Sequence, residues 1–248
     1  MPSHAQPLVQ TSAAVRYGKN IKRLLSLIEV VNTAWKPIIN QLEDVSPKVP
    51  TAVPGDEVDK KLDILVTQGE AVFTGVQFAF EWYVVIIVTM AEAYLEDVLA
   101  AAAALDPKLM EKSEQRASYA EVIDARSLEH LADSLRHRWA RNFIEDGGPS
   151  KWISRLNRMG LTPLTTDNVR KLEELWGLRH TVVHRVGVVD AEFVSRHPQL
   201  GHKAGDALSL SRDNVLAYFR SAGDIVGAID SFFLKRIPAL ASGSTKTE

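Results

Sequence analysis

The sequence Trp82-Tyr83-Val84-Val85-Ile86-Ile87-Val88-Thr89-Met90-Ala91 decides the fold, because it lies inside residues 57–105, a stretch without proline. This stretch ends in an Ala-rich run of good helix formers. We therefore expect one long helix, or two stacked helices that bend near Gly75. Glu81 and Glu92 bound the apolar run, which is shorter than the roughly 18 apolar residues of a membrane span. The sequence thus predicts a buried central helix and no membrane segment.

The rest of the chain shows the same helical spacing of apolar residues. Residues 17–43 form an amphipathic pattern, which predicts an N-terminal helix that is kinked or broken at Pro37. Thr165 or Thr166 is the expected N-cap of a helix that stops at Gly187. The further elements that we expect are helices over 127–145, 150–159, 167–186 and 212–235, a stop at 146–149 and a short strand over 207–210.

These elements predict an all-α protein, because almost no stretch shows the alternating pattern of a strand. Prolines and a glycine predict a linker over 46–56. We therefore divide the chain into a helical arm with its linker over 1–56, a helical domain over 57–241 and a disordered tail over 242–248.

The composition and the absence of certain motifs exclude several classes of function. The 248 residues include no cysteine, which excludes disulfides, thiolate zinc sites and cysteine nucleophiles. No Gly-rich phosphate loop and no G-x-S-x-G motif occurs, so nucleoside triphosphate hydrolysis and serine hydrolase chemistry have no support. The first residues lack the basic and apolar regions of a secretory signal, and we expect a cytoplasmic protein.

The charge is unevenly distributed along the chain. The formal net charge is only −2, but residues 41–125 carry ten more acidic than basic side chains. Residues 126–212 carry four more basic than acidic side chains. This polarity is not typical of a protein that coats DNA, and we expect no DNA partner. A small basic site for a single polyanion remains compatible with it.

Arg179-His180-Thr181-Val182-Val183-His184 carries the densest cluster of functional side chains. His180 and His184 are four residues apart, so they lie on one face of a helix, as in the zinc motif H-E-x-x-H. Thr181 stands where that motif has its catalytic Glu, and no third ligand is evident. We therefore expect neither a metal nor another cofactor.

Arg179 and His184 are five residues apart, so they point about 140° from each other on an ideal helix. One copy of the helix cannot easily bring both to the same atom, whereas two copies across a two-fold axis can. A phosphodiester in such a cleft would meet guanidinium groups for its oxygens and imidazoles for the proton of a ribose 2′-hydroxyl. The spacing thus favours a homodimer that acts on RNA without a metal.

The stretch Arg179–His184 resembles the R-x4-H motif of HEPN ribonucleases. The following stretch, 186–193, is similar to the turn after the motif in that family, and 205–210 is similar to its C-terminal part. The stretch 91–99 resembles the helix that packs on the motif helix. The resemblance covers about 70–236, is interrupted over 106–165, and is closest to the RiboL-PSP-type subgroup.

The resemblance implies a HEPN-like helical bundle with an extra N-terminal helix, and a homodimer that cleaves RNA without metal. It implies that His184 is the base or acid, that Arg179 holds the phosphate and that His180 is a polar helper. It also implies a toxin or phage-defence role, with an antitoxin or regulatory protein as a further partner. Val186 stands where antitoxin-modified members carry Tyr, which argues against that modification here.

Two interpretations stay open at several positions. The basic side chains outside the core of the motif either guide RNA along a groove or cover a solvated face. Trp139 and Trp152 either stack on bases or, as we favour, pack in the core. We take Glu92 and Glu96 as surface charges. The arginines concerned are Arg136, Arg141, Arg155, Arg158 and Arg185.

The alternative function is a non-catalytic helical dimer that binds a regulatory partner, RNA or a nucleotide. We expect the side chains of Arg179 and His184 to be exposed, and an open cleft that contains both at a symmetric interface would favour the enzyme. Burial of these residues without a path for RNA would favour the binding module.

Overall fold

The computed structural model describes residues 10–45, 56–111, 115–145, 148–160 and 164–245, and within them the chain is helical. This confirms the prediction of an all-α fold. The elements are α1 (Ser12–Val45), α2 (Asp56–Leu105), η2 (Pro107–Met110), α3 (Tyr119–Asp124), α4 (Leu128–Glu145), α5 (Gly148–Arg158), α6 (Thr166–Arg185), α7 (Ala191–Arg196), η3 (Pro198–Leu200), α8 (Arg212–Arg236) and η4 (Pro238–Thr245).

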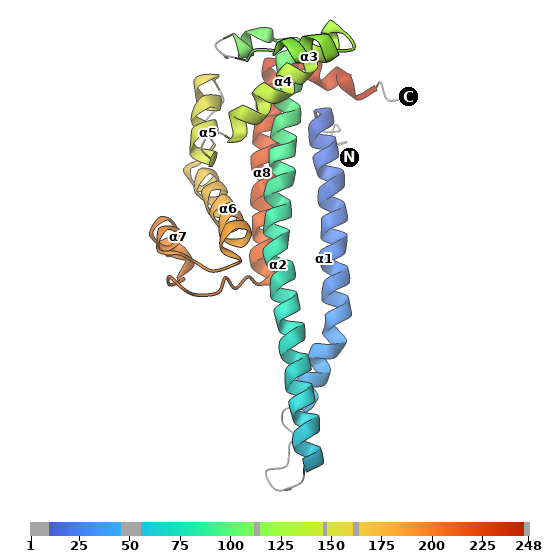
Figure 1. The fold of residues 1–248 in the computed structure, drawn as a ribbon, viewed down its shortest axis with the longest axis vertical. Coiled ribbons are helices and arrows are strands. Elements are labelled where there is room, and N and C mark those ends of the chain that lie inside the picture. The colour runs from blue at the N-terminus through green and yellow to red at the C-terminus, as the bar shows by residue number, and fades with distance from the viewer. Residues whose placement is uncertain (1–9, 46–55, 112–114, 146–147, 161–163, 246–248) are drawn as a thin grey trace, which may run out of the picture.

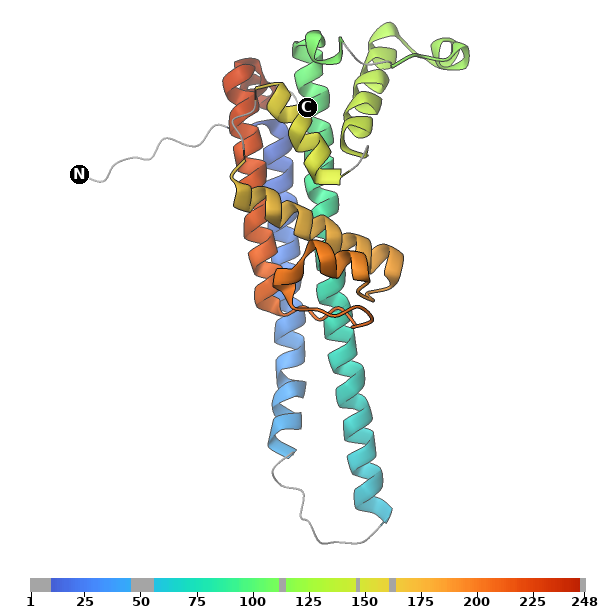
Figure 2. The same cartoon turned by 90° about the vertical axis from the view of Figure 1, so that its left-hand side faces the viewer.

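The helix α2 is the axis of the molecule, and α1 and α8 run beside it (Figures 1 and 2). The chain continues from α2 into α3 and α4 at one end of this bundle, and α5, α6 and α7 cover one side of it (Figure 1). The helix α2 is continuous through Gly75, so the first of our two alternatives for this stretch is correct. The linker that we expected over 46–56 lies outside the described residues up to 55, and Asp56 begins α2.

The helix α1 differs in one way from our expectation. It is continuous through Pro37, so the break that we considered there is wrong. A proline removes one backbone hydrogen bond, and the other hydrogen bonds of the helix can maintain its course. Its first half also contributes Tyr17, Leu24 and Ile28 to the buried core, so α1 packs with the bundle.

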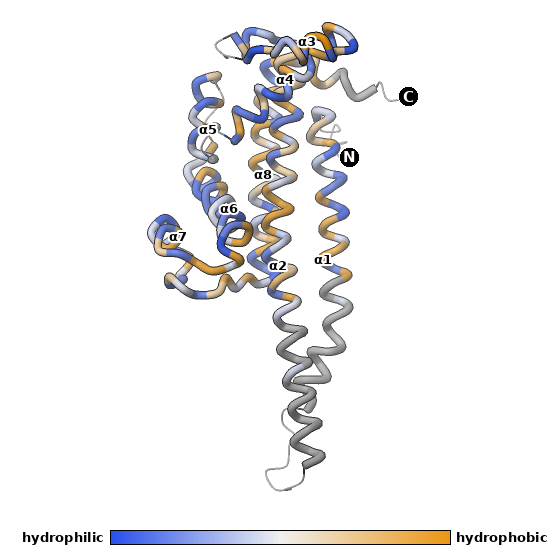
Figure 3. Tube along the Cα trace, viewed as in Figure 1, coloured by the Kyte–Doolittle hydropathy of each residue, from blue (hydrophilic) through white to orange (hydrophobic). Residues whose placement is uncertain are grey.

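Buried apolar side chains hold the bundle together along its length. Hydrophobic residues line much of the part of α2 and α8 where the two helices run side by side (Figure 3). Val84 and Ile87 on α2 and Leu178 on α6 are fully buried in one cluster, which also contains side chains of α1 and α8. The alternation of inward and outward positions is that of an amphipathic helix. Burial of α6 against α2 and α8 fixes the helix that carries the motif.

A polar contact joins the two ends of the chain. Thr11 caps α1, because its hydroxyl oxygen accepts a hydrogen bond of 3.1 Å from the backbone N–H of Ala14. The same hydroxyl donates to Asp230 on α8 at 2.5 Å, and the Thr11 backbone N–H donates to this carboxylate at 3.2 Å. Tyr94 on α2 donates to it as well, at 3.3 Å. Asp230 therefore joins α1, α2 and α8.

The region between α4 and α6 is helical over more residues than expected. We expected 146–149 to be a stop, but Gly148 and Pro149 already form the first turn of α5. Proline is favoured in a first turn, where its missing N–H leaves no helical bond unmade. Trp139 and Trp152 are buried, as the core interpretation predicted.

The C-terminal part contains less strand and more helix than expected. Instead of a strand over 207–210, one isolated bridge pairs Val188 with Ala207. The helix η4 extends to Thr245 and thus covers the first residues of the segment that we expected to be a disordered tail. None of the described helices is long and apolar enough to cross a membrane.

Candidate functional site

The helix α6 begins and ends where the sequence predicts. The Thr165 hydroxyl oxygen accepts a hydrogen bond of 3.2 Å from the Asn168 backbone N–H, so Thr165 is the N-cap. At the other end Val186 is left-handed, with φ of 52°, and the Gly187 N–H donates to the Thr181 carbonyl at 3.1 Å. This ending closes the helix directly after the motif.

The first half of α6 is fixed by a buried carboxylate. Glu174 is 6 % exposed and accepts a hydrogen bond of 2.6 Å from the Tyr218 hydroxyl on α8. Arg170 and Gln199 donate to its other oxygen at 3.1 and 3.2 Å. Burial, then the hydrogen bond to Glu174, raise the pKa of Tyr218 far above its ordinary value, so this phenol stays protonated. Glu174 therefore sets the position of α6 against α8.

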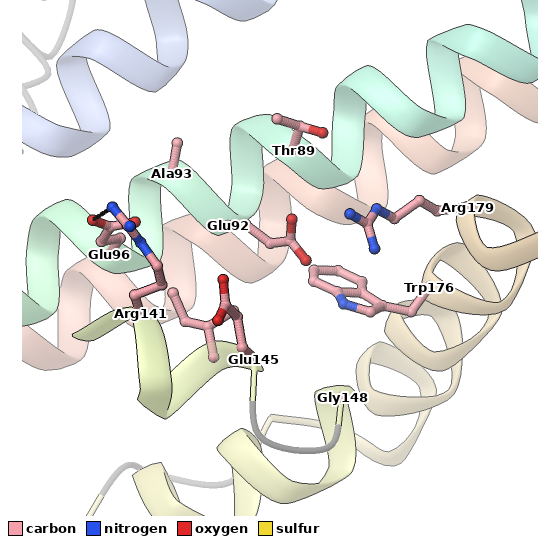
Figure 4. A pocket seen from close by; sticks show the side chains of 10 residues that line it. Thr89, Glu92, Ala93, Glu96, Arg141, Glu145, Gly148, Trp176 and Arg179 are labelled. Carbon is pink, nitrogen blue, oxygen red and sulfur yellow. Dashed lines mark hydrogen bonds and ion pairs between the residues drawn. The ribbon is translucent and has the colours of Figure 1, made fainter. Parts of the chain in front are cut away.

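The motif residues lie on two sides of the second half of α6. The rings of His180 and His184 lie together, with centroids 4.7 Å apart, and both side chains are exposed. Arg179 points the other way, toward α2, and is only half exposed, in contrast to the exposed side chain that we expected (Figure 4). A single chain thus keeps the arginine and the histidine pair apart, as the helical spacing predicts.

Arg179 faces a cavity of about 460 Å³ between α2, the end of α4 and α6. The Arg179 Nε is buried and has no hydrogen-bond partner in the described part of the chain. Burial of such a donor without a partner costs about 1–3 kcal/mol. The lining, shown in Figure 4, comprises Thr89, Glu92, Ala93, Glu96, Arg141, Ile144, Glu145, Gly148, Trp176 and Arg179.

Glu92 is the carboxylate of this cavity that faces Arg179 and Trp176 (Figure 4). Burial raises the pKa of Glu92 above its ordinary value, while the charge of Arg179 and a hydrogen bond with the Trp176 side chain lower it. Glu96 differs, since it pairs with Arg141 at 3.2 Å and with His137 at 3.3 Å. Glu92 is therefore a site candidate, whereas we had taken it as a surface charge.

His180 lines a second cavity, of about 770 Å³, between the start of α5, α6 and α7. His197 lies in its wall and stacks on Phe193 with ring centroids 4.9 Å apart. Burial lowers the pKa of His197 below its ordinary value, which favours the neutral form of the ring. A Cβ atom on Gly177 would lie 2.6 Å from Nε2 of His197, so this close approach of α7 to α6 requires a glycine.

Most of the other candidate arginines bind to neighbouring groups of the protein. Arg136 pairs with Glu129 at 2.6 Å and with Asp133 at 3.4 Å. Arg155 donates to the Phe143 carbonyl at 2.8 Å. Arg141 pairs with Glu96, Arg185 pairs with Asp190 at 3.4 Å, and Arg158 is exposed on α5. Arg141 is the member of this set that lines the cavity of Arg179.

The described residues contain no group of three His, Cys, Asp or Glu side chains that could hold a metal ion. Two residues that line the Arg179 cavity were missed by the sequence analysis. Trp176 could have been found, because it precedes Arg179 by three residues on the same helix. Glu92 was harder to find, because the resemblance places 91–99 on a helix that packs against the motif helix but does not show which of its side chains faces Arg179.

Comparison with protein-family models, with curated proteins and with solved structures finds no match for this chain. The resemblance of the motif to HEPN ribonucleases therefore stays a prediction. The function has to be argued from the arrangement of Arg179, His180 and His184.

Proposed function

We propose that the chain is a metal-independent endoribonuclease of the toxin or phage-defence type, located in the cytoplasm, with a site completed by a second copy. One observation carries this proposal. The exposed pair His180 and His184 and the cavity-facing Arg179 occupy two sides of the same helix end. Two copies related by a two-fold axis can place the arginine of one beside the histidines of the other.

An exposed apolar surface next to the histidine pair supports a second copy. Val183, Val186 and Val188 are exposed at the end of α6, and Val186 is 88 % exposed. The side chain of Glu81 lies at Gly187 and links this helix end to α2, where Phe78 and Trp82 are exposed as well. We call these five apolar side chains the α6-end surface. Several exposed apolar side chains near one helix end are a feature that interfaces share.

The chemistry follows from the two kinds of side chain. In the proposed reaction one His184 removes the proton of a ribose 2′-hydroxyl, and the 2′-oxygen attacks the adjacent phosphorus. The bond from phosphorus to the 5′-oxygen breaks, and the same imidazole, now protonated, donates this proton to that oxygen. Arg179 stabilises the negative charge that gathers on the phosphate oxygens. The products are a 2′,3′-cyclic phosphate end and a 5′-hydroxyl end.

The test is cleavage of a pool of structured and single-stranded RNA in excess EDTA, with analysis of the product ends. We expect cyclic phosphate ends from the unmutated protein, and loss of roughly 100-fold or more of the rate in His184→Ala and Arg179→Ala. His130→Ala, an exposed histidine on α4, is the matched control and should cleave normally. Cleavage by His184→Ala at the normal rate would refute the proposal.

Mixing the two inactive variants tests the second copy. A dimer of one Arg179→Ala chain and one His184→Ala chain retains one arginine and one histidine, on different chains. If they act across the interface, mixing restores part of the activity; if they act within one chain, it restores none. Restoration therefore supports the proposed arrangement, and its absence contradicts it.

A non-catalytic binding module is the second candidate function. The position of Arg179 favours it, because Arg179 lines a cavity that does not contain His180 or His184, so within one chain a ligand bound there would not meet the imidazoles. The RNA assay separates the two functions. Absence of cleavage by a folded, dimeric protein would leave the binding module as the function.

A further inference from the structure

Trp176 stands between the two cavities and lines both of them. Trp139 and Trp152 are buried in the core, whereas Trp176 is partly exposed. Its ring contacts Trp152 with centroids 6.2 Å apart, so the core supports the indole from behind. Because Trp176 lies three residues before Arg179 and four before His180, it is next to each of them on the helix surface, although these two point to different cavities.

We propose that Trp176 and Glu92 form a binding site for an unpaired guanine base of the substrate. The inference rests on the proposed function for the role of Arg179, which would hold the phosphate attached to this nucleotide. The site itself is the cavity of about 460 Å³ between α2, α4 and α6, which is in the range of pockets for small ligands.

The indole provides the flat face of the site. Bases in single strands bind proteins by stacking on aromatic side chains, at about 1–3 kcal/mol per base. The indole plane is held by its contact with Trp152, so it needs no reordering when a base arrives. A base in a duplex is stacked between its neighbours and cannot reach a ring in a cavity. The substrate is therefore single-stranded at this position.

The Glu92 carboxylate provides the specificity. It is an acceptor, and it lies beside the Trp176 ring and opposite Arg179 (Figure 4). The Watson–Crick edge of guanine presents two adjacent donors, N1–H and the N2 amino group, which match two carboxylate oxygens. Adenine and cytosine present one amino donor next to a ring acceptor, and uracil presents one N–H between two carbonyls. Guanine is therefore the base that this carboxylate prefers.

The test measures binding of mononucleotides, which does not depend on cleavage. Isothermal titration calorimetry of the full chain with guanosine 5′-monophosphate, inosine 5′-monophosphate and cytidine 5′-monophosphate compares the three bases. Inosine lacks only the N2 amino group, so we expect it to bind several-fold more weakly than guanosine, and cytidine to bind more weakly still. Equal affinity for all three nucleotides, or no saturable binding of guanosine 5′-monophosphate, overturns the site.

Two pairs of variants test the roles of Trp176 and Glu92 separately. Trp176→Leu should weaken binding of guanosine 5′-monophosphate about tenfold, while Trp176→Phe, which keeps an aromatic face, should bind nearly as well as the unmutated chain. Glu92→Gln should remove the difference between guanosine and inosine, and Glu129→Gln on α4, outside both cavities, should keep it. Normal binding by Trp176→Leu, or a guanosine preference that persists in Glu92→Gln, contradicts the proposal.

The test of the guanine site and the test of the ribonuclease can give different answers. Guanosine binding by a chain that does not cleave RNA would support the site and contradict the ribonuclease. Cleavage without any preference for guanosine nucleotides would support the ribonuclease and overturn the site.

Discussion

The two halves of α6 are built in different ways. The first half ends at Glu174, a buried carboxylate that accepts hydrogen bonds from Arg170 of the same half and from Tyr218 and Gln199 outside the helix. The second half carries Arg179, whose buried Nε has no partner in the described residues, and two exposed histidines. Both halves belong to one helix of 20 residues, so the first half can hold the second in place.

The contrast separates structural polar groups from candidate functional ones. Buried polar groups in proteins are nearly always hydrogen-bonded, because an unpaired one costs free energy of folding. Glu174 follows this rule, because it accepts hydrogen bonds from Tyr218 on α8 and from Gln199 in the segment after α7. Arg179 departs from it beside a cavity, where a ligand can provide the missing partner. Unsatisfied polar groups next to cavities thus locate a site more sharply than the mere presence of charged residues.

The largest expected effect on stability comes from breaking the first half of α6. Glu174→Ala should lower the free energy of unfolding by about 3 kcal/mol, because it leaves the buried Tyr218 hydroxyl without its acceptor. Thermal unfolding should show a loss of roughly 8 °C. Glu192→Ala, which breaks an exposed ion pair with Arg196 on α7, is the control and should cost below about 0.5 kcal/mol. A loss by Glu174→Ala as small as that of the control would mean that this network does not fix α6.

A smaller effect on stability is expected from substitution of Gly177, which lies between the two halves of α6. An alanine is favoured over glycine in a helix by about 1 kcal/mol, but its Cβ would lie 2.6 Å from Nε2 of His197. We therefore expect Gly177→Ala to destabilise the protein by about 1–2 kcal/mol in chemical denaturation. In a His197→Ala background the same substitution should stabilise it, because the clash is gone. A stabilising Gly177→Ala in the unmutated background would contradict the close packing of α7 on α6.

The smallest expected effect concerns Glu92 and its pH dependence. Burial raises its pKa in the folded state above the ordinary value of 4.5, so the folded protein favours the protonated form. The stability that comes from this protonated carboxyl is present below pH 4.5 and is lost as the pH rises through the folded-state pKa. Glu92→Gln, which stays neutral, should therefore unfold at a melting temperature higher by on the order of 1 °C at pH 7.

Measurement of the melting temperature over a range of pH provides the control for this prediction. The difference between Glu92→Gln and the unmutated protein should close as the pH falls toward 4, since both side chains are then neutral. Glu129→Gln, which breaks an exposed ion pair with Arg136 on α4, should not raise the melting temperature at pH 7. A Glu92→Gln protein that is less stable than the unmutated protein at pH 7 would contradict this prediction and show that ionised Glu92 stabilises the fold as a partner of Arg179.

Local features of the fold could be predicted from the sequence. The Thr165 cap, the end of α6 and the burial of Trp139 and Trp152 depend on residues close together in the chain, which is why spacing and turn chemistry revealed them. The continuity of α1 through Pro37 was harder, because the other hydrogen bonds of a helix can maintain its course past the one that a proline removes.

The candidate site could be predicted only in part. The motif on α6 was visible in the sequence, and so was the separation of Arg179 from His184 by the pitch of the helix. The exposure of Arg179 was predicted wrongly, because α2 and the end of α4 form a cavity over it. Spacing along one helix gives no information about the other helices that surround it, and this is also why Glu92 was missed.

The contact of Thr11 with Asp230 has a consequence for the order of folding. It joins residues that are 219 positions apart, and closing so long a loop costs more chain entropy than any contact inside a single helix. During synthesis α1 leaves the ribosome first, but the carboxylate that holds its cap is made only with α8. The first helix of the chain is therefore among the last to be locked in place, and the nascent protein must keep its apolar face soluble until the final helix arrives.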